Sequence, residues 1–199
     1  MAQPNLLDVD WSKIPAPLDD GGTAHLRGLT VPSVSLLATD DATVTLSELS
    51  GRTVVFAYPR TGEPGKIALV DDWDMIPGAR GCTPQTCAFR DLYAELKAAG
   101  AKHVFGLSTQ SNAYQAEMAS RLHLPFPVLS DEKLQLTKAL NLPTMEVAGL
   151  TLIKRMALII DDARITHVFY PVFPLDRNAG DVLAWLKENR VHGVVERSG

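Results

Sequence analysis

The feature that most constrains the fold of this chain is the alternation of short apolar runs with segments of helical period. The run RTVVFAYP at 52–59 is rich in β-branched and aromatic residues, which is typical of a buried strand, and KHVFGLST at 102–109 is a second such run. Between them, four apolar residues follow the spacing of one helix face: Phe89, Leu92, Tyr93 and Leu96. Such alternation predicts an α/β layered fold with a largely parallel sheet.

The rest of the chain extends the same pattern. Extended segments are predicted at 31–40, 43–51, 124–131, 147–161 and 164–173, with 147–161 forming two strands or a hairpin. Helices are predicted at 114–122, 132–142 and 178–189, the first two with Ser111 and Asp131 as N-caps. The closing strand–strand–helix order indicates one antiparallel edge.

Two segments lack periodicity. Residues 1–28 contain three prolines and three glycines, and we expect them to form an irregular N-terminal arm in front of one domain at 29–199. A loop at 61–81 follows the first buried strand and is broken by glycine and proline. Structureless loops of this length are uncommon in compact domains and are often functional.

Composition limits the classes of partner. The formal net charge of −4 argues against a nucleic-acid binder, which usually carries a basic patch. No apolar run reaches the ~18 residues that span a bilayer, so we expect no membrane partner. The first residues lack a basic and then apolar leader, so we expect a cytoplasmic protein. In that compartment a close cysteine pair is redox-active or metal-binding rather than structural.

The only two cysteines, Cys82 and Cys87, lie in the segment GARGCTPQTCAFRD at 78–91. Cys82 follows a glycine-rich turn, which places it at the start of the predicted helix. Free backbone N–H groups and the helix dipole favour an anion there, and therefore a reactive thiolate. Arg80 and Arg90 can add positive charge. Cys87 lies further along the same helix, where we expect it to be more sheltered.

The spacing of the pair makes a geometric demand. Residues five apart on a helix have Cα atoms roughly 8.6 Å apart. A disulfide needs Cα atoms within about 7 Å, so Cys82 and Cys87 can bond only if the first turns unwind.

Three other interpretations of the cysteine pair stay open. Buried cysteines often act as small apolar residues. Structural zinc needs four Cys or His ligands, and no histidine pair lies nearby. A thioredoxin-like dithiol has two intervening residues, whereas this pair has four.

The segment GCTPQTCAFRD at 81–91 resembles the cysteine segment of the peroxiredoxins, in the bacterioferritin-comigratory-protein or PrxQ branch. The resemblance extends over roughly 29–189, with matching stretches such as TVVFAYPR, LPFPVLSD and IKRMALIIDDARITHVF. It implies an α/β thioredoxin-like fold, with a central mixed sheet flanked by helices. It also implies a thiol-dependent peroxidase acting on hydrogen peroxide and small organic hydroperoxides without a metal or organic cofactor.

The resemblance implies specific residue roles. Cys82 is the peroxidatic cysteine, which becomes a sulfenic acid, and Cys87 resolves this acid to an intramolecular disulfide. Arg155 matches the arginine that stabilises the thiolate and binds the peroxide oxygens. Thioredoxin or a similar dithiol then reduces the disulfide. We expect a monomer or a weak dimer.

The sequence departs from the family pattern at one point. Ala79 and Met75 occupy the positions of the family's threonine and proline, counted back from Cys82. Pro59 and Thr61 lie upstream, separated from Cys82 by an insertion that either shapes a pocket or docks a partner. Thr61, Thr83 and backbone N–H groups are candidates to replace the missing hydroxyl.

Two other functions remain as alternatives. A thiol–disulfide oxidoreductase would use the same cysteine pair on protein disulfides. A redox-sensing interaction module would use oxidation to unwind the helix and change a binding surface, for which the 61–81 loop and the N-terminal arm are the support.

Overall fold

The computed structural model describes residues 10–190, and its centre is a seven-stranded mixed sheet in the order β2-β1-β5-β4-β3-β8-β9. The strands are β1 Ser35–Ala38, β2 Thr43–Thr45, β3 Arg52–Ala57, β4 His103–Ser108, β5 Val128–Ser130, β8 Met156–Asp161 and β9 Arg164–Phe169. Two further strands, β6 Thr144–Val147 and β7 Leu150–Ile153, form a separate antiparallel hairpin. The mixed sheet flanked by helices confirms the thioredoxin-like expectation.

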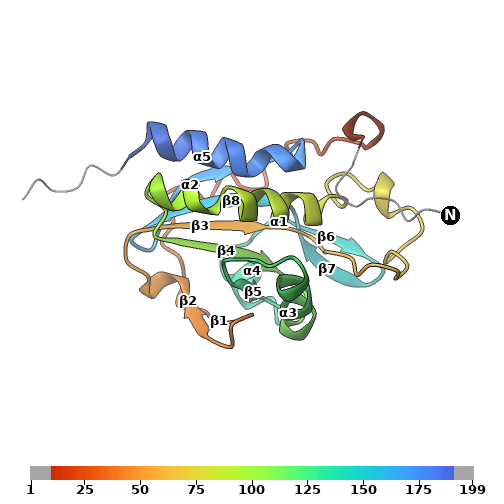
Figure 1. The fold of residues 1–199 in the computed structure, drawn as a ribbon, viewed down its shortest axis with the longest axis horizontal. Helices are drawn as coiled ribbons and strands as arrows, with labels where there is room; N and C mark the ends of the chain where they lie inside the picture. The colour runs from red at the N-terminus through yellow and green to blue at the C-terminus, as the bar shows by residue number, and fades with distance from the viewer. Residues whose placement is uncertain (1–9, 191–199) are drawn as a thin grey trace, which may run out of the picture.

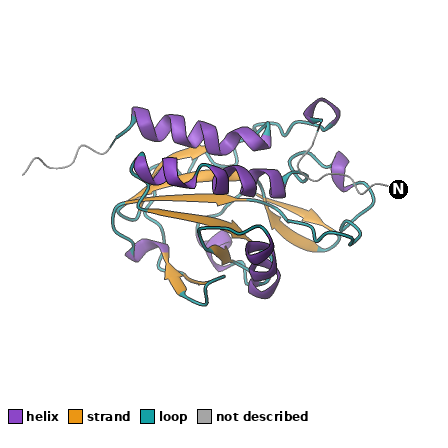
Figure 2. Cartoon of the chain, viewed as in Figure 1, coloured by secondary structure: helices purple, strands orange, loops and turns teal. Residues whose placement is uncertain are grey.

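The helices are α1 Cys82–Asp91, α2 Tyr93–Ala98, α3 Asn112–Arg121, α4 Gln135–Ala139 and α5 Asn178–Glu188. Short 3-10 turns are η1 Trp11–Lys13, η2 Leu46–Glu48, η3 Trp73–Met75 and η4 Leu175–Arg177. Helices α1, α2 and α5 lie together over one face of the sheet, whereas α4 lies on the opposite side (Figures 1 and 2). The sheet is therefore covered on both faces, as the buried apolar strands predict.

Strand β3 shows how the sheet fixes the position of α1. Its side chains alternate between two core clusters, with Val54 and Phe56 on the face of α1 and α5, and Val55 and Ala57 on the other. The Phe56 ring stacks on Phe89 of α1, with centroids 4.1 Å apart. This packing holds α1 against the sheet, so that the first turn of α1 lies close to the carboxyl end of β3.

Strand pairing differs from the sequence expectation. Only β3 with β4 and β4 with β5 pair in parallel, and every other pair in the seven-stranded sheet is antiparallel. The prediction of a largely parallel sheet with one antiparallel edge is therefore wrong, because both edges are antiparallel. Apolar alternation marks where a strand runs but carries no information about its partner.

Several boundaries also shift. Of the helix predicted at 132–142, only α4 forms, because Leu134 adopts a left-handed conformation with φ +55°. The Asp131 carboxylate nevertheless accepts hydrogen bonds from the amides of Leu136 and Thr137. The hairpin expected within 147–161 begins earlier, at β6, while β8 pairs with β3 and β9. The last predicted strand ends at Phe169 rather than at residue 173.

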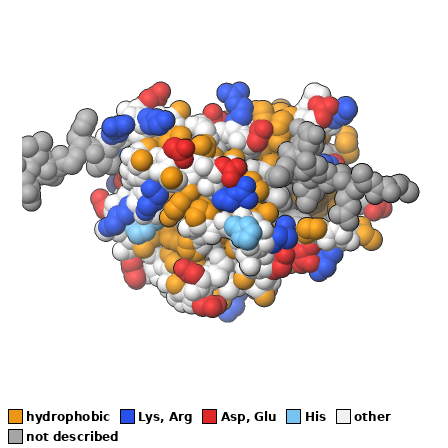
Figure 3. Space-filling view, viewed as in Figure 1, with side chains coloured by type: hydrophobic (Ala, Val, Ile, Leu, Met, Phe, Trp, Pro, Cys, Tyr) orange, Lys and Arg blue, Asp and Glu red, His pale blue; other side chains and the backbone are white. Residues whose placement is uncertain are grey.

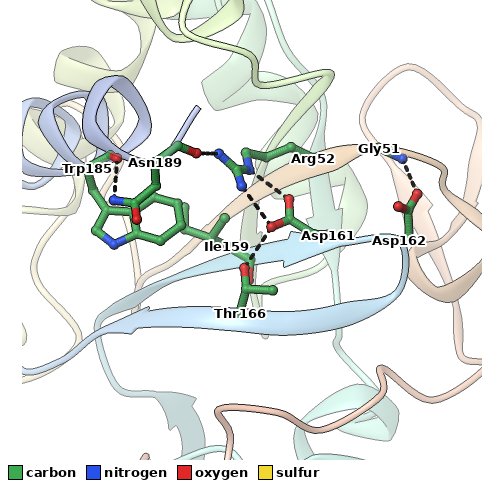
Figure 4. A network of polar contacts seen from close by, with 8 residues as sticks. All are labelled: Gly51, Arg52, Ile159, Asp161, Asp162, Thr166, Trp185 and Asn189. Atoms are coloured by element: carbon green, nitrogen blue, oxygen red, sulfur yellow. Dashed lines mark hydrogen bonds and ion pairs between the residues drawn. The ribbon is translucent and has the colours of Figure 1, made fainter. Parts of the chain in front are cut away.

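The C-terminal end of α5 is fastened to the sheet by Arg52 (Figure 4). The Arg52 guanidinium binds both carboxylate oxygens of Asp161 at 2.7 and 2.9 Å and donates to the carbonyl of Asn189. It also lies over the Trp185 ring, 5.1 Å from its centroid. Because Arg52 belongs to β3, Asp161 to β8 and Trp185 to α5, one side chain joins three elements.

The N-terminal arm predicted at 1–28 is described from residue 10 onward, so residues 1–9 lie outside the described part. Residues 10–28 contain η1 and a series of turns. Leu26 is fully buried in the core, and Gly28 donates to the carbonyl of Ile165 in β9. A domain boundary at residue 28 stays a prediction.

The molecular surface mixes charges of both signs. On the face shown in Figure 3, acidic and basic side chains alternate with apolar patches rather than forming a field of one sign. Among residues 10–190, no helix combines the length and apolar character needed to cross a bilayer.

Candidate active site

Cys82 is the first residue of α1, as the sequence predicts. Its N-cap, Gly81, adopts φ +96°, a left-handed conformation that glycine takes without strain. A Cβ at Gly81 would lie 2.4 Å from the Leu175 side chain and 2.9 Å from the Trp11 ring. Conformation and space therefore both require glycine at this turn, and the turn delivers Cys82 to the helix N-terminus.

Cys82 and Cys87 are both free thiols in α1, and both are buried. Cys82 is 2% exposed and Cys87 is 5% exposed. Cys87 is sheltered, as expected, but Cys82 is no less buried, because side chains from the N-terminal arm and from η4 pack against the turn that precedes it.

Arg155 lies between β7 and β8 and points at the cysteine. Its Nη2 is 3.1 Å from the Cys82 sulfur. The same nitrogen lies 3.1–3.3 Å from the carbonyl oxygens of Gly78, Ala79 and Arg80. One guanidinium therefore contacts the sulfur and holds the turn in front of it, so the structure brings the predicted pair Cys82 and Arg155 together.

Two residues that sequence reasoning missed hold Arg155 in place. Gln85, one turn after Cys82, accepts a hydrogen bond from Arg155 Nη1 through its Oε1. Its Nε2 donates to Asn178 Oδ1 at 2.9 Å. Both amide side chains are almost fully buried. A glutamine within the cysteine motif is a sequence signal for Gln85, whereas Asn178 lies 93 positions away and has no local signal.

The other predicted cations do not contact the sulfur. Arg80 pairs with Asp74 in the loop, and Arg90 pairs with Asp91 at 2.8 Å. The positive group in contact with the Cys82 sulfur is therefore Arg155.

A cavity of about 530 Å³ opens beside Cys82. Its wall consists of the start of α1, Tyr114 of α3 and a large part of the 61–81 loop, which lies beyond the end of β3 and is yellow in Figure 1. Thr61 and Thr83 both line this cavity, whereas Ala79 is fully buried behind the cysteine. The loop thus shapes a pocket, which was one of the two roles expected for it.

Thr61 is held firmly at the cavity wall. Its amide and its hydroxyl both donate to Gln110 Oε1, at 2.9 and 3.1 Å. Its carbonyl accepts from Gln110 Nε2 at 3.2 Å and from the Tyr114 hydroxyl at 3.1 Å. The hydroxyl oxygen keeps its lone pairs, because its proton is used by Gln110.

Burial changes the ionisation of two groups near the site. Burial raises the pKa of the Tyr58 phenol, the Cys82 charge raises it further and Arg155 opposes the shift. Tyr58 therefore stays protonated and donates to Gln115 Oε1 at 2.9 Å. Burial also raises the pKa of the Cys87 thiol, with Arg90 acting in the opposite direction. While α1 is intact, Cys87 is held as a thiol.

The helix keeps the two sulfurs apart. Both cysteines belong to one continuous α-helix, in which Cα atoms five residues apart are roughly 8.6 Å from each other. The Thr86 hydroxyl donates to the Cys82 carbonyl at 2.8 Å, so its side chain bonds back to the first turn. A disulfide between Cys82 and Cys87 requires the turn to unwind.

Comparison with known proteins gives consistent matches. Residues 26–183 match the family described as Redoxin. The chain is 33% identical over 167 residues to peroxiredoxin Bcp of Escherichia coli K12, covering 81% of this chain and 96% of that protein. It is 31% identical over 163 residues to chloroplastic peroxiredoxin Q of Oryza sativa subsp. japonica, covering 81% of this chain.

A solved structure shares the fold. The crystal structure of peroxidoxin BcpB from Mycobacterium tuberculosis has a TM-score of 0.66 and 27% sequence identity, covering 83% of this chain and 98% of that chain. The chain spans 66% of the rice protein, just under two thirds of its length.

Proposed function

The chain belongs to the Redoxin family, in the branch of peroxiredoxin Q and Bcp, and on this premise we propose that it is a thiol peroxidase. Its proposed substrates are hydrogen peroxide and small organic hydroperoxides. The observation that carries the proposal is the 3.1 Å contact between Arg155 Nη2 and the Cys82 sulfur, at a helix N-terminus beside a cavity.

In the first proposed step the Cys82 thiolate attacks one oxygen of the peroxide. A sulfur–oxygen bond forms, the O–O bond breaks, and the second oxygen leaves as alcohol or water after taking up a proton. Cys82 becomes a sulfenic acid. Arg155 stabilises negative charge on the sulfur before the attack and on the leaving oxygen during it, because its guanidinium is fixed and largely screened from water.

Thr61 supplies the hydroxyl that the family motif places at Ala79. Its oxygen can accept a hydrogen bond from the peroxide, since its own proton goes to Gln110. We choose Thr61 over Thr83 because its backbone and side chain are both fixed by Gln110 at the cavity wall.

In the second proposed step Cys87 attacks the sulfenic sulfur. The S–S bond forms, the S–O bond breaks and water leaves with the Cys87 proton. A dithiol reductant, thioredoxin or a similar protein, then restores both thiols by exchange. The proposal includes a cytoplasmic location, where thiols are kept reduced, and a monomer or weak dimer.

A peroxide assay coupled to thioredoxin and its reductase tests this function. Wild type is compared with Cys82→Ser and Cys87→Ser. We expect Cys82→Ser to abolish turnover. Cys87→Ser should consume one equivalent of peroxide and then stall, because the sulfenic acid has no resolving thiol. Full peroxidase activity in Cys82→Ser would refute the proposal.

An insulin-reduction assay separates this function from a thiol–disulfide oxidoreductase. With Cys82 only 2% exposed, its sulfur is accessible to a small peroxide in the cavity but not to a protein disulfide. We expect insulin reduction to stay near the background rate. Efficient insulin reduction with poor peroxide turnover would favour the oxidoreductase.

A further inference from the structure

The N-terminal arm contacts the turn that carries Cys82. Trp11 in η1 lies with two ring carbons 2.9 and 3.2 Å from the position of a Cβ on Gly81, so the indole packs directly on this glycine. Leu175 of η4 packs on the same glycine from a second direction. Trp11 and Leu175 together cover the point where α1 begins.

The arm is anchored close to the active site. Asp20 accepts from Lys154 Nζ at 2.6 Å and from the Tyr170 hydroxyl at 2.7 Å. Lys154 is the neighbour of Arg155 in the chain. Trp11 also meets the Phe173 ring edge to face, with centroids 6.2 Å apart. The half-buried Trp11 is therefore held by its contact with Phe173 and by the anchored arm, in addition to its packing on Gly81.

This packing opposes the unwinding that a disulfide requires. If the first turn of α1 opens, Gly81 leaves the position in which Trp11 and Leu175 pack against it. The hydrogen bonds of Arg155 to the carbonyls of Gly78, Ala79 and Arg80 are disturbed by the same movement. Breaking these interactions raises the free energy of the opened state relative to the folded helix.

We propose that Trp11 is a positioning residue for the resolving step. It keeps the first turn of α1 folded through Gly81, and thereby sets the rate at which Cys87 reaches the Cys82 sulfenic acid. The inference rests on the proposed peroxidase function, and it assigns the arm a part in that reaction.

The rate matters because two reactions compete for the sulfenic acid. Cys87 converts it to the disulfide with loss of water. Alternatively, a second peroxide molecule transfers an oxygen to sulfur, its O–O bond breaks, and alcohol or water leaves, which yields a sulfinic acid that simple thiols do not reduce. A tightly held turn keeps Cys82 in its reactive position but prolongs its exposure to the second peroxide.

The test compares wild type, Trp11→Phe and Trp11→Ala in a single oxidation cycle without reductant, with hydrogen peroxide in excess over the protein. Rapid quench and intact-mass analysis resolve the sulfenic, disulfide and sulfinic forms. For Trp11→Ala we expect disulfide formation about tenfold faster, which corresponds to about 1.4 kcal/mol. The sulfinic fraction should fall accordingly. Sulfenic acid formation should stay within about twofold of wild type, and Trp11→Phe should lie between.

Leu18→Ala is the matched control. Leu18 belongs to the same arm but is 86% exposed. Its replacement should therefore leave the ratio of disulfide to sulfinic acid unchanged. If Trp11→Ala forms the sulfenic acid normally but the disulfide no faster than wild type, the inference is refuted while the peroxidase function stands. If wild-type Cys82 does not react with peroxide, both are refuted.

Hydrogen exchange on the wild-type protein gives a second test that needs no variant. Peptides covering 10–20 and 78–84 are compared between the reduced and the disulfide forms. We expect exchange to rise in both segments on oxidation, because the arm loses its packing partner when the turn opens. Faster exchange in 78–84 with an unchanged arm would refute the inference.

Discussion

Arg155 Nη2 lies 3.1 Å from the Cys82 sulfur, across 73 positions of sequence, and the same nitrogen also contacts three carbonyls of the preceding turn. The guanidinium therefore binds the sulfur and the backbone of the turn at the same time. If the turn opens, the sulfur leaves the guanidinium. The contact with the Cys82 sulfur and the folding of the first turn of α1 are therefore coupled through this one side chain.

Replacement of Arg155 should reduce the rate of peroxide reduction. We expect Arg155→Met to lower kcat/KM for hydrogen peroxide by about 10²-fold or more, as is typical when a fixed donor to developing charge is removed. Arg155→Lys should recover only part of the lost kcat/KM. A lysine ammonium lacks the planar guanidinium that contacts the sulfur and the turn together. The coupled peroxidase assay measures both. A wild-type rate in Arg155→Met would show that the contact has no role in the reaction.

Gln85 should act through Arg155 rather than on the peroxide. Gln85→Ala removes the acceptor of Arg155 Nη1, so we expect kcat/KM to fall by about tenfold, less than for Arg155→Met. Gln85→Glu keeps the acceptor for Arg155 but loses the donor to Asn178 Oδ1 and adds a negative charge beside the guanidinium, so we expect it to recover little of the rate. A double variant separates this from a purely structural effect, because Gln85→Ala should cost no further rate in an Arg155→Met background if it acts through the guanidinium. An equal loss of rate from Gln85→Ala with and without Arg155 would contradict the positioning role.

Thr61 should contribute a hydrogen bond to the reaction. We expect Thr61→Val to lower kcat/KM by about tenfold, because the isosteric valine removes the hydroxyl oxygen from the cavity wall, and Thr61→Ser to retain most of the activity. Thr83→Val serves as the comparison on the other side of the cavity. A larger loss in Thr83→Val than in Thr61→Val would assign the missing family hydroxyl to the helix instead.

The buried Cys87 thiol should react slowly with alkylating reagents. In a Cys82→Ser variant, Cys87 is the remaining thiol, and burial raises its pKa. We therefore expect iodoacetamide to modify it slowly at about pH 8, with the rate still climbing well above the ordinary thiol pKa of about 8.5. In urea the profile should move back to the ordinary value. An identical profile with and without urea would contradict the effect of burial.

The Arg52–Asp161 pair should make the free energy of unfolding depend on pH in the acidic range. Burial alone would raise the pKa of Asp161, but the hydrogen bonds and charge of Arg52, together with Thr166, hold it below its usual value. Such a carboxyl contributes stability that is present above its unfolded pKa of about 3.9 and is lost as the pH falls through the folded pKa. We expect Asp161→Asn to lower the free energy of unfolding by about 1–3 kcal/mol at neutral pH.

Urea unfolding at neutral pH and at about pH 3 checks this. The difference in the free energy of unfolding between wild type and Asp161→Asn should become smaller in acid. Asp162→Asn is the control. Its carboxylate is more exposed and accepts one backbone hydrogen bond from Gly51, which an asparagine oxygen can also accept (Figure 4). If this difference in the free energy of unfolding stays constant with pH, the Arg52–Asp161 pair does not cause the acid dependence.

Local features of the site could be predicted well from the sequence. The glycine-rich turn and the first residues of α1 place Cys82 at a helix start through interactions within a few positions of one another. The five-residue spacing of the cysteines requires unwinding whatever surrounds the helix. The role of Arg155 came from the resemblance to a family, and no pattern in its own strand region identifies Cys82 as its partner.

The long-range features could not be predicted in the same way. Asn178 reaches Gln85 only because α5 packs beside α1 on one face of the sheet. Trp11 meets Gly81 only because the arm folds back over the molecule. Residue spacing reports on neighbours along the chain, and these contacts join segments that are tens of positions apart.

The sequence by itself determined the strands, most of the helices, the position of Cys82 at a helix N-terminus and the separation of the two thiols. The reason is that backbone hydrogen bonding, turn conformation and side-chain periodicity act over a few residues. Only the tertiary structure decided the antiparallel edges, the cavity walls, the Gln85–Asn178 support and the burial of both cysteines. These depend on which apolar faces pack together, and packing is settled by the whole chain at once.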